Sequence, residues 1–317
     1  MPLDHYVSQV HLKRFYSPAL NSRKMYAIRK RDQYQFICGS RDVCRTFDGS
    51  TNAYLVDQRA IEDLLREIEP RYNESVAKLH NGTPDRESVY VISAFAAYVA
   101  HCSPTAMRLF SQPLRSVVAT TAKLMEELGE LPPPPPILGG NSLTELLNSG
   151  KVDICIDPKY PQAIGISVIL KTLSVFGNSS WELLHNDEDS LSPFFTSDFP
   201  VAIERTADTR VNGRIVPLSP NFAIKITPDL SLRDSSEDFS FSKFRWQSRR
   251  AKFEEIRSIN KAIVQCAESL VFFRDNSHWV SDFVAKNSPF QIQPLVEKLP
   301  SRDGTLHIFS QRVARVG

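Results

Sequence analysis

The sequence lacks the short motifs that mark the best-known enzyme families. Its 317 residues contain no P-loop, no G-x-G-x-x-G, no H-E-x-x-H and no G-x-S-x-G. These motifs supply a phosphate-binding loop, a dinucleotide site, a pair of zinc-binding histidines or an activated serine. Their absence argues against the familiar nucleotide-binding and hydrolase classes and leaves unfamiliar chemistry open.

Long hydrophobic runs are missing as well. The longest nearly unbroken run, at residues 89–100, has 12 residues, whereas a membrane-spanning helix needs ~20. We therefore expect a buried helix there. Asp4 and His5 stand where a signal peptide would be apolar, so we expect no secretion and a cytoplasmic location.

Cysteine is scarce and follows no pattern. The five cysteines are odd in number, and no two form a C-x-x-C pair. A disulfide framework or a structural zinc site would need pairs at characteristic spacings. The pattern therefore predicts reduced thiols.

Charge is nearly balanced overall but unevenly distributed. The formal net charge of +2 does not single out a nucleic-acid-binding protein. Residues 11–45, however, hold nine basic and two acidic residues, and residues 46–76 hold seven acidic and three basic ones. This asymmetry indicates either a phosphate-binding face or two segments that pack together and neutralise each other.

Apolar residues recur at spacings of three and four, which predicts helices over much of the chain. One helix covers residues 57–72, and Pro70 must kink or divide it. Another covers residues 88–112 and is expected to bend at Pro104. Further helices are predicted at residues 114–128, 142–148, 161–176 and, as one long helix, 244–274.

Short aromatic and β-branched segments predict strands. Residues 24–30 and 34–38 flank a polar turn and form a candidate hairpin. We therefore expect a mainly helical α+β protein, with an N-terminal β-hairpin packed on helices and a small antiparallel sheet in the C-terminal half. The later extended segments are residues 180–185, 193–204, 214–220, 221–226 and 306–310.

Five consecutive prolines at residues 132–136 predict an extended polyproline segment. It divides the chain into a mainly helical part with the hairpin (1–131), a proline-rich connector (132–140) and an α+β part (141–317), unless the whole forms one integrated domain. The run is a spacer or, alternatively, a ligand for a proline-binding partner.

The opening segment carries a first candidate site. If it is helical, spacings of four and three place His5, Gln9 and Leu12 on one face. His5 suits a general base or a metal ligand, and Gln9 would orient it or a substrate. The structural alternative is that both side chains tie down the N-terminus by hydrogen bonds.

Acidic residues provide further candidates. Glu62 and Glu69 lie on one flank of a predicted helix, about 10 Å apart along its axis, and Arg66 between them favours a solvated salt-bridge ladder for Glu62. Glu69 stays open because the proline after it disturbs the helix. Asp198 interrupts an apolar segment, so it either caps a turn or faces a polar pocket as a general base or metal ligand.

Two weaker features remain. His101 and Cys102 are adjacent inside an apolar helix, which favours a structural role over nucleophilic catalysis. A basic segment interleaved with aromatic residues begins the helix predicted at 244–274 and suits phosphates and bases, although Glu254 and Glu255 favour a solvated face. Its members are Lys243, Arg245, Trp246, Arg249, Arg250 and Lys252.

The segment HYVSQVHLKRF, at residues 5–15, resembles the HYVPQxYLRNF opening of the bacterial DUF4238 family. The resemblance covers most of the chain, although the family has no settled activity. It implies that His5, Gln9, Glu69 and Asp198 belong to one recurring pattern and so to one site. It continues through residues 24–30, the helix at 61–69, WELL (181–184), FFTSDFPV (194–201) and VPLSPNFAI (216–224).

Two departures from the family pattern bear on this inference. Ser8 stands where relatives usually have proline, and residues 101–104 read HCSP where relatives often have arginine before Thr-Pro. If that arginine binds substrate in relatives, the activity is altered or lost here, or Arg108 one turn later substitutes for it.

The leading hypothesis is a metal-assisted nuclease in a bacterial defence or toxin setting. Asp198 and Glu69 would hold a divalent cation, Mg²⁺ or Mn²⁺, while His5 acts as general acid or base and Gln9 orients the substrate. The sequence has no nucleotide or flavin cofactor motif. RNA or DNA would bind basic residues near the N-terminus, namely Lys13, Arg14, Arg29, Arg31 and Arg45.

The rival hypothesis is a binding module without chemistry. In it the HYVSQ motif is structural, and the basic face binds nucleic acid or an acidic protein. A structural role predicts that His5→Ala and Asp198→Ala destabilise the fold, whereas a functional site would leave stability nearly unchanged.

Overall fold

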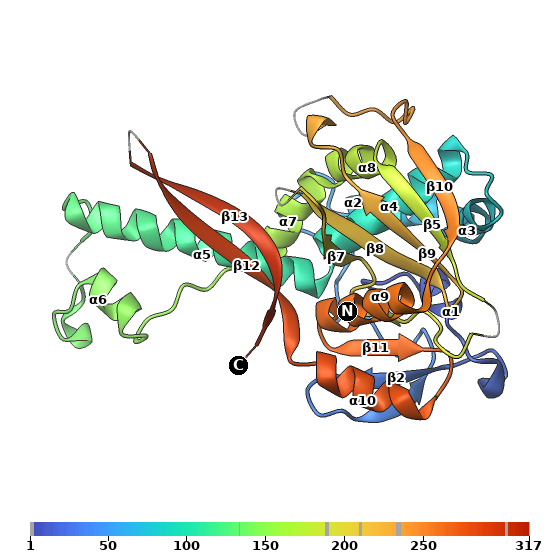
Figure 1. Ribbon diagram of the computed structural model, residues 1–317. Coiled ribbons are helices and arrows are strands. Elements are labelled where there is room, and N and C mark those ends of the chain that lie inside the picture. Colours follow the sequence, from blue (N-terminus) through green and yellow to red (C-terminus); the bar gives the residue numbers. More distant parts are fainter. Residues whose placement is uncertain are drawn as a thin grey trace.

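Runs of helices and runs of strands follow one another along the chain, as expected for an α+β protein. The computed structural model describes residues 3–132, 134–187, 190–208, 211–232, 236–301 and 304–316. Figure 1 shows a rounded body from which an arm projects. The body contains the N-terminal segment and two larger sheets, and the arm is built from the middle and the C-terminal end of the chain.

The hairpin expected near the N-terminus is present. Strands β2 (Met25–Arg29) and β3 (Gln35–Cys38) pair antiparallel and are joined by a short polar turn. The other N-terminal elements are β1 (Leu3–His5), which pairs with β4 (Arg45–Phe47), and the short helix α1 (Gln9–Lys13).

The helix expected over residues 57–72 is divided at Pro70. Helix α2 (Ala60–Ile68) leads into one 3₁₀ turn, η2 (Glu69–Arg71), and α3 (Tyr72–His80) follows. Proline is tolerated in the first turn of a new helical segment, because the N–H that it lacks would have no partner there.

Helix α4 (Arg86–Cys102) is the central helix of the body. A capping box between Asp85 and Ser88 begins it and satisfies N–H groups that a first turn leaves unpaired. Nearly all of its residues from 88 to 100 are buried. The longest apolar run of the sequence is therefore a buried helix, as expected.

The chain bends by 51° where α4 meets α5 (Pro104–Glu127), at the position that Pro104 predicts. Within the described ranges, no single helix is long and apolar enough to cross a membrane. The bent pair α4–α5 reaches that length and composition only when its two helices are taken together.

The helices between α5 and the first strand of the C-terminal half, β5, are short. Residues 161–176 form two helices instead of one, α7 (Lys159–Ser167) and α8 (Ile169–Gly177). Helix α8 packs along α4, and α7 packs against α5. Helix α6 (Leu143–Asn148) confirms the short helix predicted at residues 142–148.

A five-stranded sheet contains most of the strands predicted in the C-terminal half. Its order is β10-β5-β9-β8-β7, and all neighbours are antiparallel except β10 and β5, which are parallel. Helix α3 contacts this sheet at β5, and α9 contacts it at β7. Its strands are β5 (Ser180–His185), β7 (Ala202–Arg205), β8 (Asn212–Ser219), β9 (Phe222–Thr227) and β10 (Arg245–Arg250).

The single long helix predicted over residues 244–274 is wrong. The region forms the edge strand β10, then helix α9 (Phe253–Cys266), then strand β11 (Leu270–Phe273). Residues 245–250 are mostly exposed and pair with β5 through their backbone, so tertiary pairing overrides a weak helical preference. Helix α9 ends where the N–H groups of the following turn bind the distant side chain of Asp198.

A second sheet joins the two halves of the chain. Its order, β3-β2-β11-β6, combines the N-terminal hairpin with β11 and with the two-residue strand β6 (Thr196–Ser197). The hairpin is therefore part of a four-stranded sheet. Helix α9 lies between the two larger sheets, contacting β7 and β6, and packs against α10 (His278–Asn287) (Figure 1).

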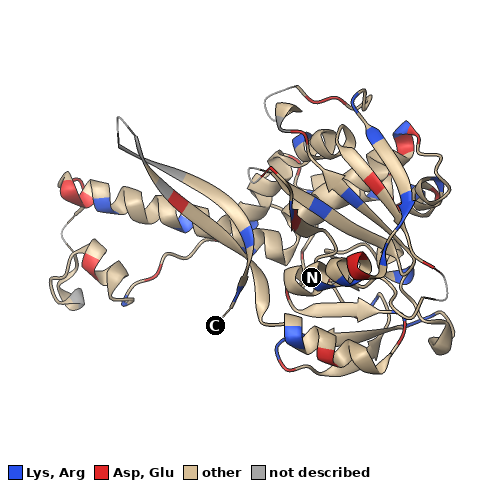
Figure 2. Ribbon diagram, viewed as in Figure 1, with Lys and Arg blue, Asp and Glu red and all other residues tan. Residues whose placement is uncertain are grey.

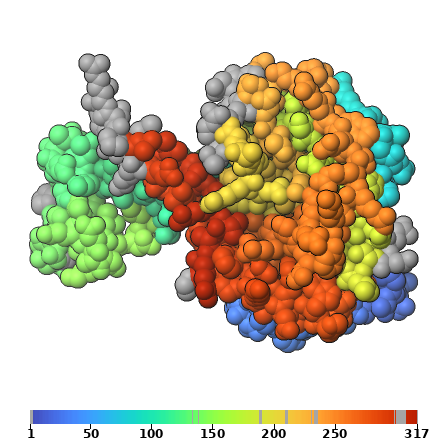
Figure 3. All heavy atoms as spheres, viewed as in Figure 1, coloured from blue at the N-terminus to red at the C-terminus, as the bar shows by residue number. Residues whose placement is uncertain are grey.

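The arm consists of α5, α6 and a long hairpin. Strands β12 (Phe290–Ser301) and β13 (Gly304–Arg315) pair antiparallel, and β12 lies along α5. Figure 3 shows the arm as a lobe beside the rounded body. The proline-rich connector links α5 to α6 within this arm, and its residue 133 lies outside the described residues.

The centre of the body is held by His11 of α1, which is completely buried. Its Nδ1 lies 2.8 Å from the Tyr72 hydroxyl in α3, and its Nε2 lies 2.9 Å from Oγ1 of Thr196 in β6. The ring stacks on Phe95 of α4, with 4.9 Å between ring centroids. Burial lowers the pKa of His11 to about 3, so the imidazole stays neutral while both nitrogens are hydrogen-bonded.

This burial makes the free energy of unfolding sensitive to acid. Because the pKa of His11 is lower in the folded state than in the unfolded chain, the unfolded state takes up the proton first. We expect stability to fall by up to ~1.4 kcal/mol per pH unit as the pH drops from about 6.5 toward 3. His11→Gln, which cannot protonate, should be less stable at pH 7 but should lose less stability in this window.

Urea unfolding of both proteins at a series of pH values measures this difference. His278→Gln, at an exposed position of α10, is the matched control and should follow the wild-type pH dependence. Equal acid sensitivity of wild type and His11→Gln would contradict the assignment.

Candidate functional site

Three of the four residues predicted to form one site line the same hollow. His5, Gln9 and Glu69 border a cavity of about 230 Å³ between β1, α1 and the end of α2. Glu69 opens the 3₁₀ turn that Pro70 creates, so the broken helix directs its carboxylate toward α1. The spacing of His5 and Gln9 and the break at Pro70 therefore converge on one place.

These side chains are already engaged with the protein itself. His5 Nε2 donates to the carbonyl oxygen of Ser40 at 3.1 Å, and the Ser40 hydroxyl donates to Gln9 Oε1 at 3.2 Å. The Ser8 hydroxyl donates to Glu69 Oε1 at 2.6 Å. Ser40, which the sequence does not single out, thus connects the opening motif to the loop after β3.

Burial lowers the pKa of His5, and the neighbouring Arg45 lowers it further, against the opposing influence of its bond to Ser40 and of Glu69 and Asp4. His5 is therefore neutral near pH 7. With Nε2 bound to a carbonyl oxygen, Nε2 must carry the proton, and Nδ1 holds the lone pair. This tautomer is the one that a general base at Nδ1 would need.

Asp198 occupies a different environment. It is fully buried, and its two oxygens accept the N–H groups of Glu268, Ser269 and Leu270 at 2.9, 2.7 and 2.9 Å. Its own N–H donates to the carbonyl oxygen of Leu270 at 3.0 Å. Asp198 therefore caps the turn between α9 and β11 and fixes β6 beside β11.

The pKa of Asp198 reflects two opposing effects. Burial raises it to about 6, while the three N–H groups hold it down. The carboxylate is thus ionised near pH 7 and makes three charge-assisted hydrogen bonds.

Glu69 and Asp198 were expected to hold a divalent cation together. Glu69 lines the His5 cavity, and Asp198 is not among the residues around it. Across the described part of the chain, no group of three or more His, Cys, Asp or Glu side chains is arranged to hold a metal ion. A cation at Glu69 would take the rest of its ligands from water and substrate.

A larger hollow of about 610 Å³ lies next to the His5 cavity and shares Leu3 of β1 with it. We call it the arginine hollow, because Arg29, Arg31 and Arg45 line it together. Three of the five residues predicted to bind nucleic acid therefore meet in one place. The other lining residues include Tyr6, Phe36, Asp42, Cys44, Glu268 and Ser269.

The two acids of the arginine hollow are occupied elsewhere. Glu268 forms a two-pronged ion pair with Arg108, with both N–O distances at 2.8 Å. Asp42 accepts the N–H of Gly39 at 2.8 Å. Arg108 thus neutralises Glu268, whereas Asp42 keeps its charge, so the lining holds three arginines and one carboxylate without an ion pair among the described residues.

The three arginines differ in their partners. Arg29 and Arg31 share the carboxylate of Asp32, at 3.0 and 3.5 Å. Arg45 is exposed, and it forms no ion pair within 4.0 Å with any described residue. Arg45 is therefore the most available cation of the hollow.

Aromatic rings lie beside these arginines. Tyr34 is 58% exposed and stacks on Phe36, which lines the hollow, with 5.8 Å between ring centroids. The guanidinium of Arg29 lies over the Tyr34 ring at 5.5 Å. Cation and ring surfaces side by side are the elements of a base-stacking platform.

The other predicted nucleic-acid ligands do not line the arginine hollow. Arg14 is partly buried and donates to the carbonyl oxygen of Leu218 at 2.9 Å and to Asn73 at 3.3 Å. Lys13 is exposed at the end of α1. Arg14 thus connects α1 to β8.

The weaker candidates from the sequence, Glu62, His101 and Cys102, make contacts that suit a structural role. Glu62 is ion-paired with Arg66 at 2.6 Å and also with Arg59, which is the kind of ladder expected on a solvated face. His101 bonds Thr172 at 2.7 Å. Burial lowers the pKa of His101 to about 4 and raises that of Cys102 to about 12, so the reactive thiolate is disfavoured.

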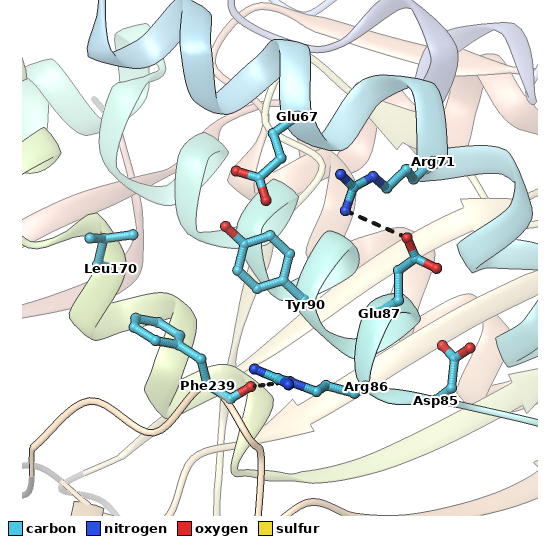
Figure 4. Close-up of a pocket in the computed structure, with 8 residues that line it drawn as sticks. All are labelled: Glu67, Arg71, Asp85, Arg86, Glu87, Tyr90, Leu170 and Phe239. Carbon is cyan, nitrogen blue, oxygen red and sulfur yellow. Dashed lines mark hydrogen bonds and ion pairs between the residues drawn. The ribbon is translucent and has the colours of Figure 1, made fainter.

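A third hollow, of about 600 Å³, lies between α2, α4 and α8 (Figure 4). Its charged groups largely satisfy one another or the backbone: Arg71 pairs with Glu87 at 3.5 Å, and Arg86 donates to the carbonyl oxygen of Phe239 at 2.8 Å. None of the predicted site residues lines it.

The Asp198 turn generates a stability prediction. Asp198→Ala leaves three buried N–H groups without an acceptor, which should lower the free energy of unfolding by at least ~3 kcal/mol. His5→Ala removes one partly buried bond and should cost only ~1 kcal/mol. Urea unfolding at pH 7 measures both, and an Asp198→Ala loss no larger than that of His5→Ala would contradict the capping role.

Comparison with known proteins agrees with the resemblance of the opening motif. A family model described as "Protein of unknown function (DUF4238)" matches residues 4–277. No curated protein and no solved structure matches the chain. The match includes the His5 cavity, the Asp198 turn and the arginine hollow, and it ends before the β12–β13 hairpin. The chain therefore belongs to the DUF4238 family.

Proposed function

We propose that this protein binds single-stranded nucleic acid, RNA or DNA, through the arginine hollow. The observation that carries the proposal is that Arg29, Arg31 and Arg45 line one hollow beside the stacked rings of Phe36 and Tyr34. Arginine binds phosphate in a two-pronged geometry, and exposed rings stack on bases irrespective of sequence.

The size of the hollow is consistent with this ligand. Its volume of about 610 Å³ is within the range of sites that hold a small molecule or a few groups of a polymer. Arg45 would bind a phosphate directly, because it forms no ion pair within 4.0 Å with any described residue. Arg29 and Arg31 would exchange their shared Asp32 for phosphate oxygens.

The contacts of the motif residues are consistent with a binding module and do not depend on a catalytic role. His5, Ser8 and Gln9 are bonded within the N-terminal segment and its neighbours, and Asp198 caps a turn. In this proposal they shape and support the wall of the hollow. Glu268 and Ser269, whose N–H groups Asp198 holds, are themselves part of that wall.

Arginine substitution tests the proposal through salt dependence. Each phosphate contact to a single strand contributes a slope of about −0.7 to log K against log salt. We expect Arg45→Ala to weaken binding of a fluorescein-labelled 20-nucleotide dT strand about tenfold and to reduce the slope by about 0.7. Fluorescence anisotropy between 50 and 300 mM NaCl measures both quantities.

Lys123→Ala is the matched control, because it removes an exposed cation on the arm helix α5. It should bind as the wild type does. An equal effect of Lys123→Ala and Arg45→Ala would indicate binding by general charge, and no binding at 50 mM NaCl would overturn the proposal.

A second candidate function is phosphodiester hydrolysis in the neighbouring His5 cavity. The observation in its favour is that His5, Gln9 and Glu69 line one cavity next to the arginine hollow. His5 would act as general base through Nδ1, Gln9 would orient the substrate, and Glu69 would help to hold Mg²⁺ or Mn²⁺.

Incubation with total RNA and with plasmid DNA, each with Mg²⁺, Mn²⁺ or EDTA, tests this candidate. Metal-dependent cleavage that is lost in His5→Ala, with stability of the variant checked by urea unfolding, would support it. Retarded migration without cleavage would leave the binding module as the function.

A further inference from the structure

Strand β10 is an uncovered, strongly basic edge of the five-stranded sheet. It is the last strand in the order β10-β5-β9-β8-β7, and no described strand pairs with its outer side. Residues 243–252 carry five basic and no acidic residues. Figures 1 and 2 show the strand along the rim of the body, with basic residues on it.

The hydrogen-bond pattern fixes which backbone groups point outward. Arg245 donates to the carbonyl oxygen of Ser179 at 3.4 Å, and Ala251 donates to that of His185 at 2.8 Å. Since successive residues of a strand point their backbone groups to opposite sides, the odd-numbered residues face β5. The N–H and C=O groups of Trp246, Ser248 and Arg250 therefore face away from the sheet.

The side chains around this edge include one exposed aromatic ring and several basic groups without an ion pair in the described part of the chain. Trp246 is 42% exposed, and its ring lies beside Gly82. Arg249 is bound by Glu182 and Glu255, and Arg250 is ion-paired with Asp187. By contrast, Lys243, Arg245 and Lys252 form no ion pair within 4.0 Å with any described residue.

Acidic residues also lie near this group. Asp229 is near enough to Lys243 and Arg245 for both to lower its pKa, although its main partner is Ser231. Asp238 binds Ser242, next to Lys243, and Glu254 lies two residues after Lys252. None of these acids forms an ion pair within 4.0 Å with Lys243, Arg245 or Lys252, so the three cations stay available to a ligand.

We propose that β10 is a docking edge for an extended acidic peptide segment, which adds to the five-stranded sheet as a sixth strand. Backbone pairing would use the outward groups of Trp246, Ser248 and Arg250. Acidic side chains of the peptide would meet Lys243, Arg245 and Lys252, and an apolar side chain would pack on Trp246.

Charge selects this occupant. A second copy of β10 would bring like charges together, which opposes edge-to-edge association. The β12–β13 hairpin of the arm protects its edge in a different way. Val316 donates to the carbonyl oxygen of Pro289, so the backbone groups of odd-numbered residues of β12 face β13. Pro294 and Pro300 have even numbers and therefore face away from β13. Both prolines thus remove outward N–H groups, and β10 has no such proline.

This difference supplies the test. Ser248→Pro removes one outward N–H and leaves the bonds of β10 to β5 in place. Ser248→Ala is its control, since it removes only the hydroxyl that bonds His185 at 3.0 Å. The probe is a fluorescein-labelled eight-residue peptide of alternating Glu and Val, compared with its Lys–Val and Gln–Val counterparts and with a 20-nucleotide dT strand.

We expect the Glu–Val peptide to bind the wild type and the Lys–Val peptide not to bind. Ser248→Pro should weaken binding about tenfold, the effect of one lost hydrogen bond, and Ser248→Ala should change it less than twofold. Arg245→Glu should weaken the Glu–Val peptide and not the Gln–Val peptide, which keeps the test valid if Ser248→Pro fails to fold.

Three outcomes would overturn the inference. The first is absence of Glu–Val binding at 50 mM NaCl, and the second is equal binding of this peptide by Ser248→Pro and Ser248→Ala. The third is that the edge binds the dT strand instead of the peptide, with dT binding weakened by Ser248→Pro and Arg245→Glu. Because Arg45→Ala acts at a different surface, it should leave peptide binding unchanged, so this test is independent of the proposed nucleic-acid function.

Discussion

The buried imidazole of His11 is the interaction on which the rest of the body depends. It joins α1 to Tyr72 of α3 and to Thr196 of β6, and its ring packs on Phe95 of the central helix. An imidazole at this place must stay neutral, because no carboxylate or carbonyl partner compensates a positive charge there. Four segments that are distant in sequence, α1, α3, α4 and β6, thus share one small polar centre.

The same segments explain why the family motifs lie where they do. The opening motif provides His5, Ser8 and Gln9 for bonds to Ser40 and Glu69. The FFTSDFPV segment provides Thr196 for His11 and Asp198 for the turn after α9. Both motifs therefore build the fold at the junction of the two halves of the chain.

Local pairing explains how a nearly neutral protein carries basic surfaces. Glu268 is bound to Arg108, and Asp32 is shared by Arg29 and Arg31. In the same way, Glu182 and Glu255 bind Arg249 on the inner side of β10. Acidic residues are thus held in local pairs, while Arg45 in one place and Arg245 in another remain available. The net charge of the chain does not reveal that paired acids and available arginines lie in different places.

The sequence by itself determined the local elements. Pro70 and Pro104 break or bend their helices, the buried run forms α4, and the hairpin β2–β3 pairs as its two segments predict. Periodicity and proline act over a few residues, so they can be read without knowing the fold. Only the tertiary structure decided the rest. Residues 245–250 became a strand because β5 offered a partner. Helix α9 ended because Asp198 binds the N–H groups of the next turn, which lie 70 to 72 residues later in the chain. His11 and Ser40 gained their roles from contacts across 185 and 35 residues, and no local pattern encodes such distances.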